Sequence, residues 1–430
     1  MKIAGYDIYK AAKYLNYIHS LPIGEKIDWQ DQSKWDIVKF HWKNNDFYND
    51  KLKNNLPKKW EELPIMQKTD YQHGINKLLS NKYTKKNTYI ANTSGSSGKP
   101  FFYAKNKNAH AMTWALTENR YKWHSLDFES KQARYFGTPL ENTGKYYELS
   151  KDFIMNRKKL LIFDLSDNAL NEHIKIFSRI KFNFIYGYTN ALVLFARYLI
   201  KNDLILNSIC PTLELCITTS EVLTFEDRKI LNSAFGVVVV NEYGISEAGG
   251  ITAFENENSD WILSSETQFI EIVDDDGSIV EVGEEGKILI TDLHNKAMPF
   301  IRYEVGDTGV LKFQESNNEL VLNKLTGRTN DTIMLPSGKK SPGLTFYYIS
   351  RSILESSGIL KEFIIRQVAL DIFIFDIISD RNLTDNEIKK IQKKMDIYLE
   401  PGLTLKINRL NTIKRPKSGK LKHFYSEINE

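Results

Sequence analysis

Residues Val237 to Gly249 read VVVVNEYGISEAG, four apolar residues followed by a polar, glycine-containing stretch. The apolar run is typical of a buried strand, and open α/β sheets bind ligands beyond the carboxyl ends of their strands. Glu247 is a hard oxygen ligand of the kind that Mg²⁺ takes beside phosphates, and Tyr243 could stack on a base. The stretch could also be an ordinary strand-to-helix turn. A hydrolase nucleophile elbow around Ser246 is disfavoured, because its second glycine is replaced by Ala248.

Short apolar runs alternate with longer amphipathic stretches on both sides of this segment, from Tyr89 to about Asp292. The predicted strands are Leu160–Asp164, Phe182–Tyr186, Leu213–Thr218 and Val237–Asn241, and the predicted helices are Ala109–Trp123, Asn168–Ile180, Asn190–Ile200 and Phe225–Phe235. Strands that alternate with helices of this length predict a largely parallel sheet covered by helices.

The pattern changes after Ser264. Short strands separated by Asp, Gly and Glu turns predict an antiparallel β subdomain: Phe269–Val273, Lys287–Thr291 and Thr308–Phe313. Beyond Gly327 the chain has its own alternation, with predicted helices over Leu344–Leu354 and Asp385–Leu399 and predicted strands over Phe363–Val368, Asp371–Ile378 and Leu403–Ile407. The sequence therefore predicts an α/β fold. A large N-terminal domain, residues 1–326, would hold helix-covered mixed sheets and the β subdomain, and a small mobile α+β lid domain would span residues 327–430.

Composition and charge exclude several classes of protein. The 430 residues carry a net charge of only +4, which argues against nucleic acid as a partner. The two cysteines, Cys210 and Cys216, form no CxxC pair, which argues against a disulfide scaffold and a cysteine zinc site. The first ten residues lack the apolar run of a signal peptide, and charges interrupt the most apolar region, 363–379, which predicts no membrane span. These features favour a reducing cytoplasm.

A loop rich in glycine and hydroxyl groups runs from Thr93 to Pro100, reading TSGSSGKP. Its backbone N–H groups could turn inward around an anion, and Lys99 adds a charge for phosphate oxygens. It is not a Walker A loop, because two residues rather than four separate Gly95 from Gly98, and Pro100 stands where Ser or Thr is needed. A flexible Ser/Gly turn remains the alternative.

Three further segments carry candidate chemistry: Arg302–Gly309, Leu325–Asp331 and Arg415–Lys422. In the first, Asp307 in a glycine-bounded turn could accept hydrogen bonds from ribose hydroxyls, although a solvated β-turn aspartate is the commoner case. The third is a basic loop, and a lysine on it could enter an active site and neutralise phosphate charge. The alternative for that loop is a solvated run of charge.

Together and in this order, these segments resemble the adenylate-forming superfamily of acyl-CoA synthetases, luciferases and peptide-synthetase adenylation domains. The chain is most similar to the shorter phenylacetate–CoA ligase branch, including members from capsular polysaccharide clusters and coenzyme adenylyltransferases. The resemblance covers nearly the whole chain, from His41–Tyr48 and Leu63-Pro64 through Gly187 and the five motifs to Lys420. Five motifs in order are much more specific than any one of them.

The resemblance implies which residues bind the nucleotide. The phosphate loop that would wrap around the β,γ-phosphates of ATP consists of Thr93, Ser94, Gly95, Ser96, Ser97, Gly98 and Lys99. Thr219-Ser220-Glu221 would pack on adenine, and Tyr243, followed by Gly244, would stack on it. Asp307 would accept from the ribose hydroxyls, and Arg328 would contact ribose and phosphate. Tyr186-Gly187-Tyr188 would line the acyl site.

The resemblance also implies the catalytic residues. Ser246 would lie near the α-phosphate, Glu247 would hold Mg²⁺, and Lys420 would bridge the carboxylate and the α-phosphate. The interdomain hinge would fall at Asn330, where the superfamily often has Asp, and Ser97 stands where Thr is commonest. Neither departure removes a charge that adenylation needs.

The implied function is that of a ligase using ATP, Mg²⁺ and, for one class of acceptor, CoA. It would activate a small carboxylic acid as acyl adenylate, release pyrophosphate and pass the acyl group to CoA, an amine, a sugar or another small acceptor. Two alternatives stay open: a non-catalytic nucleotide-binding member of the fold, and a coenzyme or sugar-linked adenylyltransferase in polysaccharide biosynthesis. The sequence does not identify the acid, and Tyr- and Phe-rich surfaces could support a homodimer.

Overall fold

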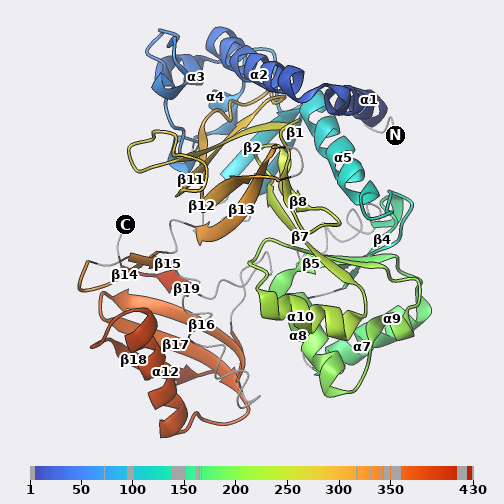
Figure 1. The fold of residues 1–430 in the computed structure, drawn as a ribbon, viewed down its shortest axis with the longest axis vertical. Coiled ribbons are helices and arrows are strands. Elements are labelled where there is room, and N and C mark those ends of the chain that lie inside the picture. Colours follow the sequence, from blue (N-terminus) through green and yellow to red (C-terminus); the bar gives the residue numbers. More distant parts are fainter. Residues whose placement is uncertain are drawn as a thin grey trace. The chain divides into compact units, whose positions relative to one another are not determined.

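A mixed sheet organises most of the chain in the computed structural model (Figure 1). The structure describes residues 5–71, 73–93, 101–136, 152–160, 162, 165, 167–315, 318–328, 332–338, 340–342, 349, 360–413 and 424–428. Among these residues, eleven strands form the sheet in the order β10 (Gln268–Val273), β11 (Glu285–Asp292), β12 (Tyr303–Phe313), β13 (Leu320–Arg328), β9 (Trp261–Leu263), β8 (Gly250–Glu255), β7 (Val238–Ile245), β6 (Leu215–Thr219), β5 (Phe184–Tyr188), β3 (Gln132–Tyr135) and β4 (Arg157–Leu160). A separate hairpin joins β1 (Thr88–Thr93) to β2 (Phe101–Asn106).

Strands β3 to β7 are parallel to one another, as the alternating pattern predicted. From β7 to β9 the pairing becomes antiparallel, so the antiparallel strands after Ser264 extend the same sheet. The helices of this part are α1 (Ile8–Ser20), α2 (Ile23–Asn44), α3 (Asp46–Lys51), α4 (Ile75–Leu78), α5 (Lys107–Lys122), α7 (Asp167–Arg179), α8 (Thr189–Lys201), α9 (Leu206–Ile209) and α10 (Phe225–Phe235), with short 3-10 turns η1 (Trp60–Glu62) and η2 (Lys68–Tyr71).

Helices cover both faces of the parallel strands (Figure 1). On one face, α7, α8 and α10 bury Phe177, Phe195 and Phe235 against the strands. On the other face, α1 and α5 pack on alternate strand residues such as Phe184 and Ile217. Burial of the apolar stripe of each helix stabilises the layers, because apolar surface leaves water on both faces. The predicted mixed α/β architecture is confirmed.

Gly187 in β5 explains how tightly β3 and β5 approach each other. A Cβ atom at Gly187 would lie 2.4 Å from Cβ and 2.7 Å from the backbone oxygen of Tyr135. A larger side chain there would force the two strands apart, so glycine is required at this position.

Most predicted elements are confirmed, and three details were wrong. The strand that contains Leu160 is β4, which begins at Arg157, earlier than predicted, and of the residues predicted beyond it 161, 163 and 164 lie outside the described residues. A prediction based on apolar runs did not include the lysines of β4, because charged residues are tolerated in an edge strand. β7 continues to Ile245, so Tyr243 and Gly244 lie in the strand rather than in a turn after it. Asp307 likewise lies within β12 and not in a turn, because pairing with neighbouring strands overrides the turn preference of Gly306 and Gly309.

Arg302 ties the N-terminal segment to the sheet through a buried ion pair. Its Nε lies 3.2 Å from Glu271 Oε1, and both side chains are buried. Its Nη1 donates to the backbone oxygens of Glu61 and Leu63, each at 3.0 Å, and its Nη2 donates to the oxygen of Gly277. These four contacts pair the N–H donors of the guanidinium group. Together they offset the free-energy cost of burying its charge.

Arg302→Met is therefore expected to lower the free energy of unfolding by roughly 3–5 kcal/mol, because it leaves the Glu271 carboxylate buried without its partner. Urea unfolding followed by circular dichroism measures this change. The double variant Arg302→Met, Glu271→Met should recover part of the loss, and a single variant as stable as the wild type would contradict the explanation.

His41 in α2 is fully buried in a hydrogen-bonded network. Its Nε2 donates to the backbone oxygen of Asn295 at 2.8 Å, and its Nδ1 lies 3.1 Å from Ser80 Oγ, which also accepts from Asn45 Nδ2. Nδ1 thus accepts from Ser80, and the ring is neutral. Burial lowers the pKa of His41 from 6.5 to about 4.

Acid is expected to destabilise the protein through His41. Above pH 6.5 the ring is neutral in both the folded and the unfolded chain, whereas between pH 6.5 and about 4 only the unfolded chain binds the proton. Stability should fall across this window by up to about 3 kcal/mol from this residue. Urea midpoints at pH 7.5 and pH 5 measure the loss, which should be smaller in His41→Gln; equal losses in both proteins would refute the assignment.

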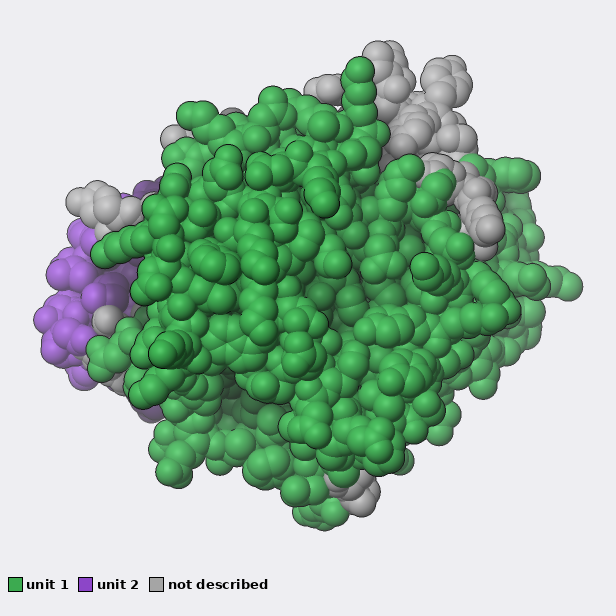
Figure 2. Space-filling view, turned by 90° about the horizontal axis from the view of Figure 1, so that it is seen from above, with its two compact units in different colours: residues 1–305, 310–324, 417–419 green, residues 306–309, 325–416, 420–430 purple. Residues whose placement is uncertain are grey.

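The chain divides into two compact units, coloured separately in Figure 2. The first contains residues 1–305, 310–324 and 417–419, and the second contains residues 306–309, 325–416 and 420–430. The described elements of the second unit are β14 (Thr332–Met334), β15 (Lys340–Pro342), β16 (Leu360–Ala369), β17 (Ile372–Ser379), α12 (Asp385–Tyr398), β18 (Thr404–Arg409) and β19 (Phe424–Ser426). A sheet ordered β18-β17-β16-β19 packs one face on Ile391 and Met395 of α12. The helix predicted over Leu344–Leu354 falls almost wholly outside the described residues.

Candidate functional site

The turn that joins β7 to β8 carries the central candidate residues. Ser246 is exposed and Glu247 is half-buried, directly after the last residue of β7. Glu247 Oε1 accepts a hydrogen bond from the Tyr303 hydroxyl at 3.1 Å. Its Oε2 receives no hydrogen bond from the part of the chain that the structure describes. The hydrogen bond from Tyr303 to Oε1 therefore orients the Glu247 carboxylate, and among the described residues nothing occupies Oε2, which can bind a ligand.

The backbone beyond Glu247 is fixed from two sides. Gly249 has a φ of +101°, and a Cβ there would lie 2.4 Å from Gln268 Nε2. The Gly249 oxygen accepts from Thr113 Oγ1 of α5 at 3.0 Å, and Gln268 Nε2 of β10 donates to the oxygen of Ile251 at 3.1 Å. The turn needs glycine because a side chain would displace Gln268. These contacts give Glu247 a defined place at the end of the strand.

Lys105 in β2 is a neighbour of Glu247 that the sequence reasoning missed. It is only 2% exposed, and its Nζ lies 3.4 Å from Thr113 Oγ1. Burial lowers the pKa of Lys105, while the charges of Asp292 and Glu247 act in the opposite direction. Asp292 Oδ2 is buried and has no hydrogen-bond partner within the described part of the chain. The sequence did not indicate Lys105, because its carboxylate neighbours Asp292 and Glu247 come from distant parts of the chain.

The ends of β6 and β7 bring two further candidates to the same edge, because these strands are parallel and Thr219 pairs with Glu242. Ser220 follows β6 directly and is exposed, with a φ of +70°. The carboxylate of Glu221 accepts from the backbone N–H of Asn190 at 2.8 Å, in the first turn of α8, where a negative charge is favourable. Tyr243 is buried in β7 and Gly244 is exposed.

A buried carboxylate lies beside the expected acyl segment. Glu242 Oε1 accepts from the Tyr186 hydroxyl at 2.7 Å and from Thr219 Oγ1 at 3.2 Å. Burial raises the pKa of Glu242, and these hydrogen bonds oppose the shift. Tyr186 is thus held with its hydroxyl at the carboxyl ends of β6 and β7.

The remaining candidates are placed only in part. Asp307 is buried within β12. Thr93 is the last residue of β1 and Arg328 the last of β13, but their side chains are not among those described. The others lie outside the described residues, namely Ser94, Gly95, Ser96, Ser97, Gly98, Lys99, Asn330 and Lys420. Their roles stay predictions.

The described residues bear on metal binding and on membrane insertion. None of these residues forms a cluster of three or more His, Cys, Asp or Glu side chains fit to hold a metal ion. The helices that the structure describes include none with both the length and the apolar character needed to cross a membrane.

Comparison with known proteins adds two sequence relatives. The chain is 24% identical to Protein CapK of Staphylococcus aureus over 417 residues, which cover 93% of this chain and 89% of CapK. It is 30% identical to phenylacetate-coenzyme A ligase of Thermus thermophilus over 132 residues, 29% of each protein. No protein-family model matches the chain.

Solved structures share the fold. A 2-hydroxyisobutyryl-CoA ligase in the postadenylation state, in complex with R3-HIB-AMP, matches with a TM-score of 0.73 at 14% identity, over 95% of this chain and 91% of its own. The amide bond synthetase McbA from Marinactinospora thermotolerans matches with a TM-score of 0.54 at 12% identity, over 77% of this chain and 67% of its own. The expected fold is confirmed by these structures. The chain has the fold of the adenylate-forming superfamily, and CapK and phenylacetate-coenzyme A ligase are among its sequence relatives.

Proposed function

We propose that the protein is an ATP-dependent ligase that activates a carboxylic acid as acyl adenylate, releases pyrophosphate and transfers the acyl group to CoA or an amine. The observation that carries the proposal is Glu247, oriented by Tyr303 with one carboxylate oxygen available at the carboxyl edge of a parallel sheet. The fold-sharing ligase holds R3-HIB-AMP, and McbA is an amide bond synthetase. The first neighbour supports an acyl adenylate and CoA as acceptor, and the second supports an amine as acceptor.

The chemistry is a displacement at phosphorus. A carboxylate oxygen of the acid attacks the α-phosphorus of ATP, and the bond from that phosphorus to the bridging oxygen of pyrophosphate breaks. Two anions must meet, so catalysis depends on positioning and on neutralisation of charge. Among this chain's residues, Ser246 would donate toward the α-phosphate, and Lys420 would bridge the reacting carboxylate and that phosphate.

Glu247 fits a role in holding Mg²⁺. It offers one oxygen free of hydrogen bonds from described residues, and Mg²⁺ beside phosphates is commonly held by one or two carboxylates, with phosphate and water completing its shell. A bound Mg²⁺ would supply charge compensation at the phosphates. The lack of a larger carboxylate cluster among the described residues suits this arrangement.

The second half of the proposal concerns the C-terminal part of the chain. Residues 327–430 would act as a lid domain that turns about Asn330 and delivers Lys420 during adenylation. A lid that rotates away afterwards would let one site serve both adenylation and acyl transfer. The described α+β fold of the second unit, with its own core, is consistent with a domain that moves as one body.

Carboxylate-dependent exchange of labelled pyrophosphate into ATP tests the proposal. At least one acid from a broad panel should support exchange, and the mass of the product should show AMP released after acyl transfer. Failure of every acid, together with binding of ATP in calorimetry, would replace the proposal with a non-catalytic nucleotide-binding role. A product that retains AMP would instead indicate an adenylyltransferase.

Lys105→Met is expected to lower kcat/KM for exchange by roughly tenfold or more, because it removes a buried positive charge beside Glu247 and Asp292. The matched control is Lys122→Met, at an exposed lysine of α5. Steady-state exchange kinetics and the melting temperature of each variant separate a catalytic effect from unfolding. Equal exchange kinetics in both variants would show that Lys105 has no part in the site.

A further inference from the structure

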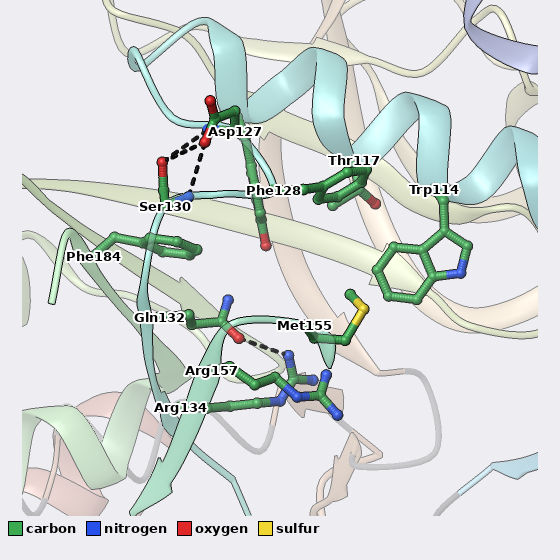
Figure 3. Close-up of a pocket in the computed structure, with 11 residues that line it drawn as sticks. Trp114, Thr117, Asp127, Phe128, Ser130, Gln132, Arg134, Met155, Arg157 and Phe184 are labelled. Carbon is green, nitrogen blue, oxygen red and sulfur yellow. Dashed lines mark hydrogen bonds between the residues drawn. The ribbon is translucent and has the colours of Figure 1, made fainter. Parts of the chain in front are cut away.

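A small pocket lies between α5 and the β3–β4 edge of the sheet, within the first unit (Figure 3). Its volume is about 40 Å³, room for roughly three water molecules. Trp114 of α5 and Phe184 of β5 contribute apolar walls, while Gln132, Arg134 and Arg157 contribute the polar end. The space is the size of one small polar group rather than of a whole organic acid.

The polar end is positively charged. Figure 3 shows the guanidinium groups of Arg134 and Arg157 close together. Arg157 Nε donates to Asp152 Oδ1 at 2.7 Å, but among the residues that the structure describes no carboxylate lies within ion-pair distance of Arg134. The one hydrogen bond that Arg134 makes there runs from Nη1 to Gln132 Oε1 at 3.2 Å. Burial lowers the pKa of Arg134, and the charge of Arg157 acts in the same direction, while Tyr186, Tyr121 and Glu242 oppose the shift.

Among the described residues, Asp152 is the one carboxylate that forms an ion pair with either guanidinium group, and two neighbouring guanidinium groups favour an anion. Arginine offers planar donors that match a carboxylate, and a bound anion would relieve the repulsion between the two positive charges. The carboxylate that lines the pocket, Asp127, is exposed and accepts from Ser130 and from the backbone N–H of Glu129 in its own turn. The buried carboxylate of Glu242 on β7 acts on Arg134 from outside the lining and accepts from the Tyr186 hydroxyl. Among the described residues, the lining itself therefore offers no carboxylate to Arg134.

The pocket adjoins the segment proposed to line the acyl site. Arg134 of β3 pairs with Tyr186 of β5 in the sheet register, and its guanidinium lies 5.2 Å from the centre of the Tyr186 ring. The Tyr186 hydroxyl donates to Glu242 at the end of β7. An acid whose reacting carboxylate lies near that end of the sheet could thus extend a second group toward Arg134.

We propose that this pocket binds a second carboxylate on the substrate, so that the acid activated by the protein is a dicarboxylic acid. The inference rests on the proposed function, because it names the class of acid for the same site. The hydrocarbon between the two carboxylates would contact the aromatic walls, and Arg134 and Arg157 would hold the distal group.

Matched pairs of acids test the inference in the exchange assay: succinate against butyrate, glutarate against valerate, and phthalate against benzoate. The preferred diacid should exceed its matched monoacid in kcat/KM by roughly tenfold or more, as expected for charged hydrogen bonds. Arg134→Gln should abolish this ratio, whereas Arg179→Gln, an exposed arginine of α7, should keep it. A monoacid preference in the wild type, or the same ratio in Arg134→Gln, would overturn the inference.

Binding without ATP gives a second readout. Trp114 lines the pocket, so titration with the best diacid should change tryptophan fluorescence saturably in the wild type and not in Arg134→Gln or Trp114→Phe. Inorganic phosphate serves as the competing probe, and tighter binding of phosphate than of every diacid would overturn the assignment. Diacid binding without exchange by any acid would contradict the proposed function and retain this pocket. Exchange supported by monoacids alone would contradict the pocket assignment and retain the proposed function.

Discussion

Lys420→Ala is expected to lower the rate of acid-dependent ATP–pyrophosphate exchange by about 10²–10³-fold, the usual cost of removing one preorganised stabiliser of developing charge. In the proposed reaction the lysine contacts the acid and the α-phosphate as their charges approach. The loss should therefore appear mainly in kcat, with a smaller change in the KM for ATP.

The second half-reaction provides an internal control for Lys420. Acyl transfer from a synthetic acyl adenylate should continue in Lys420→Ala, because the lysine would serve adenylation only. Lys417→Ala, in the same basic stretch, should retain exchange. An unimpaired Lys420→Ala enzyme would remove the lysine from the mechanism, and an equal loss in both half-reactions would indicate a structural role.

Glu247→Gln is expected to reduce exchange by a similar 10²–10³-fold and to raise the Mg²⁺ concentration needed for half-maximal rate. Glutamine has nearly the same shape and can still accept from the Tyr303 hydroxyl, so the fold should persist. What it lacks is the negative charge that a divalent cation requires. Exchange measured across a Mg²⁺ titration gives both effects.

The matched control for Glu247 is Glu257→Gln, an exposed carboxylate between β8 and β9. It should leave both the rate and the Mg²⁺ dependence unchanged. If Glu247→Gln had the same Mg²⁺ dependence as the wild type, another residue would have to hold the ion.

The sequence predicted those parts of the fold whose signal is local. β5, β6 and β7 are apolar runs between amphipathic helices, and their burial in the centre of the sheet requires that pattern. β4 is the edge strand and carries a run of basic residues, whereas β3 lies between β5 and β4 and carries Gln132 and Arg134. Polar residues are tolerated on the edge strand β4, and β3 has only 4 residues, so a prediction based on hydrophobic runs displaced β4 and missed β3.

The candidate site likewise contains residues that the sequence could place and residues that it could not. Ser246 and Glu247 could be placed at the end of a strand, because they follow β7 directly in the chain. The Tyr303 hydroxyl that orients Glu247 comes from a residue 56 positions away, and no periodicity encodes that contact. Lys105 and Arg134 were missed for the same reason, since their importance depends on neighbours supplied by other strands.

The transfer of oxygen from acid to nucleotide tests the central claim most directly. The acid that supports exchange would be prepared with ¹⁸O in its carboxylate, and the AMP formed during acyl transfer would be analysed by mass spectrometry. Attack by the carboxylate on the α-phosphorus predicts one ¹⁸O atom in each AMP molecule. Unlabelled AMP, or ADP as the released nucleotide, would contradict activation through an acyl adenylate.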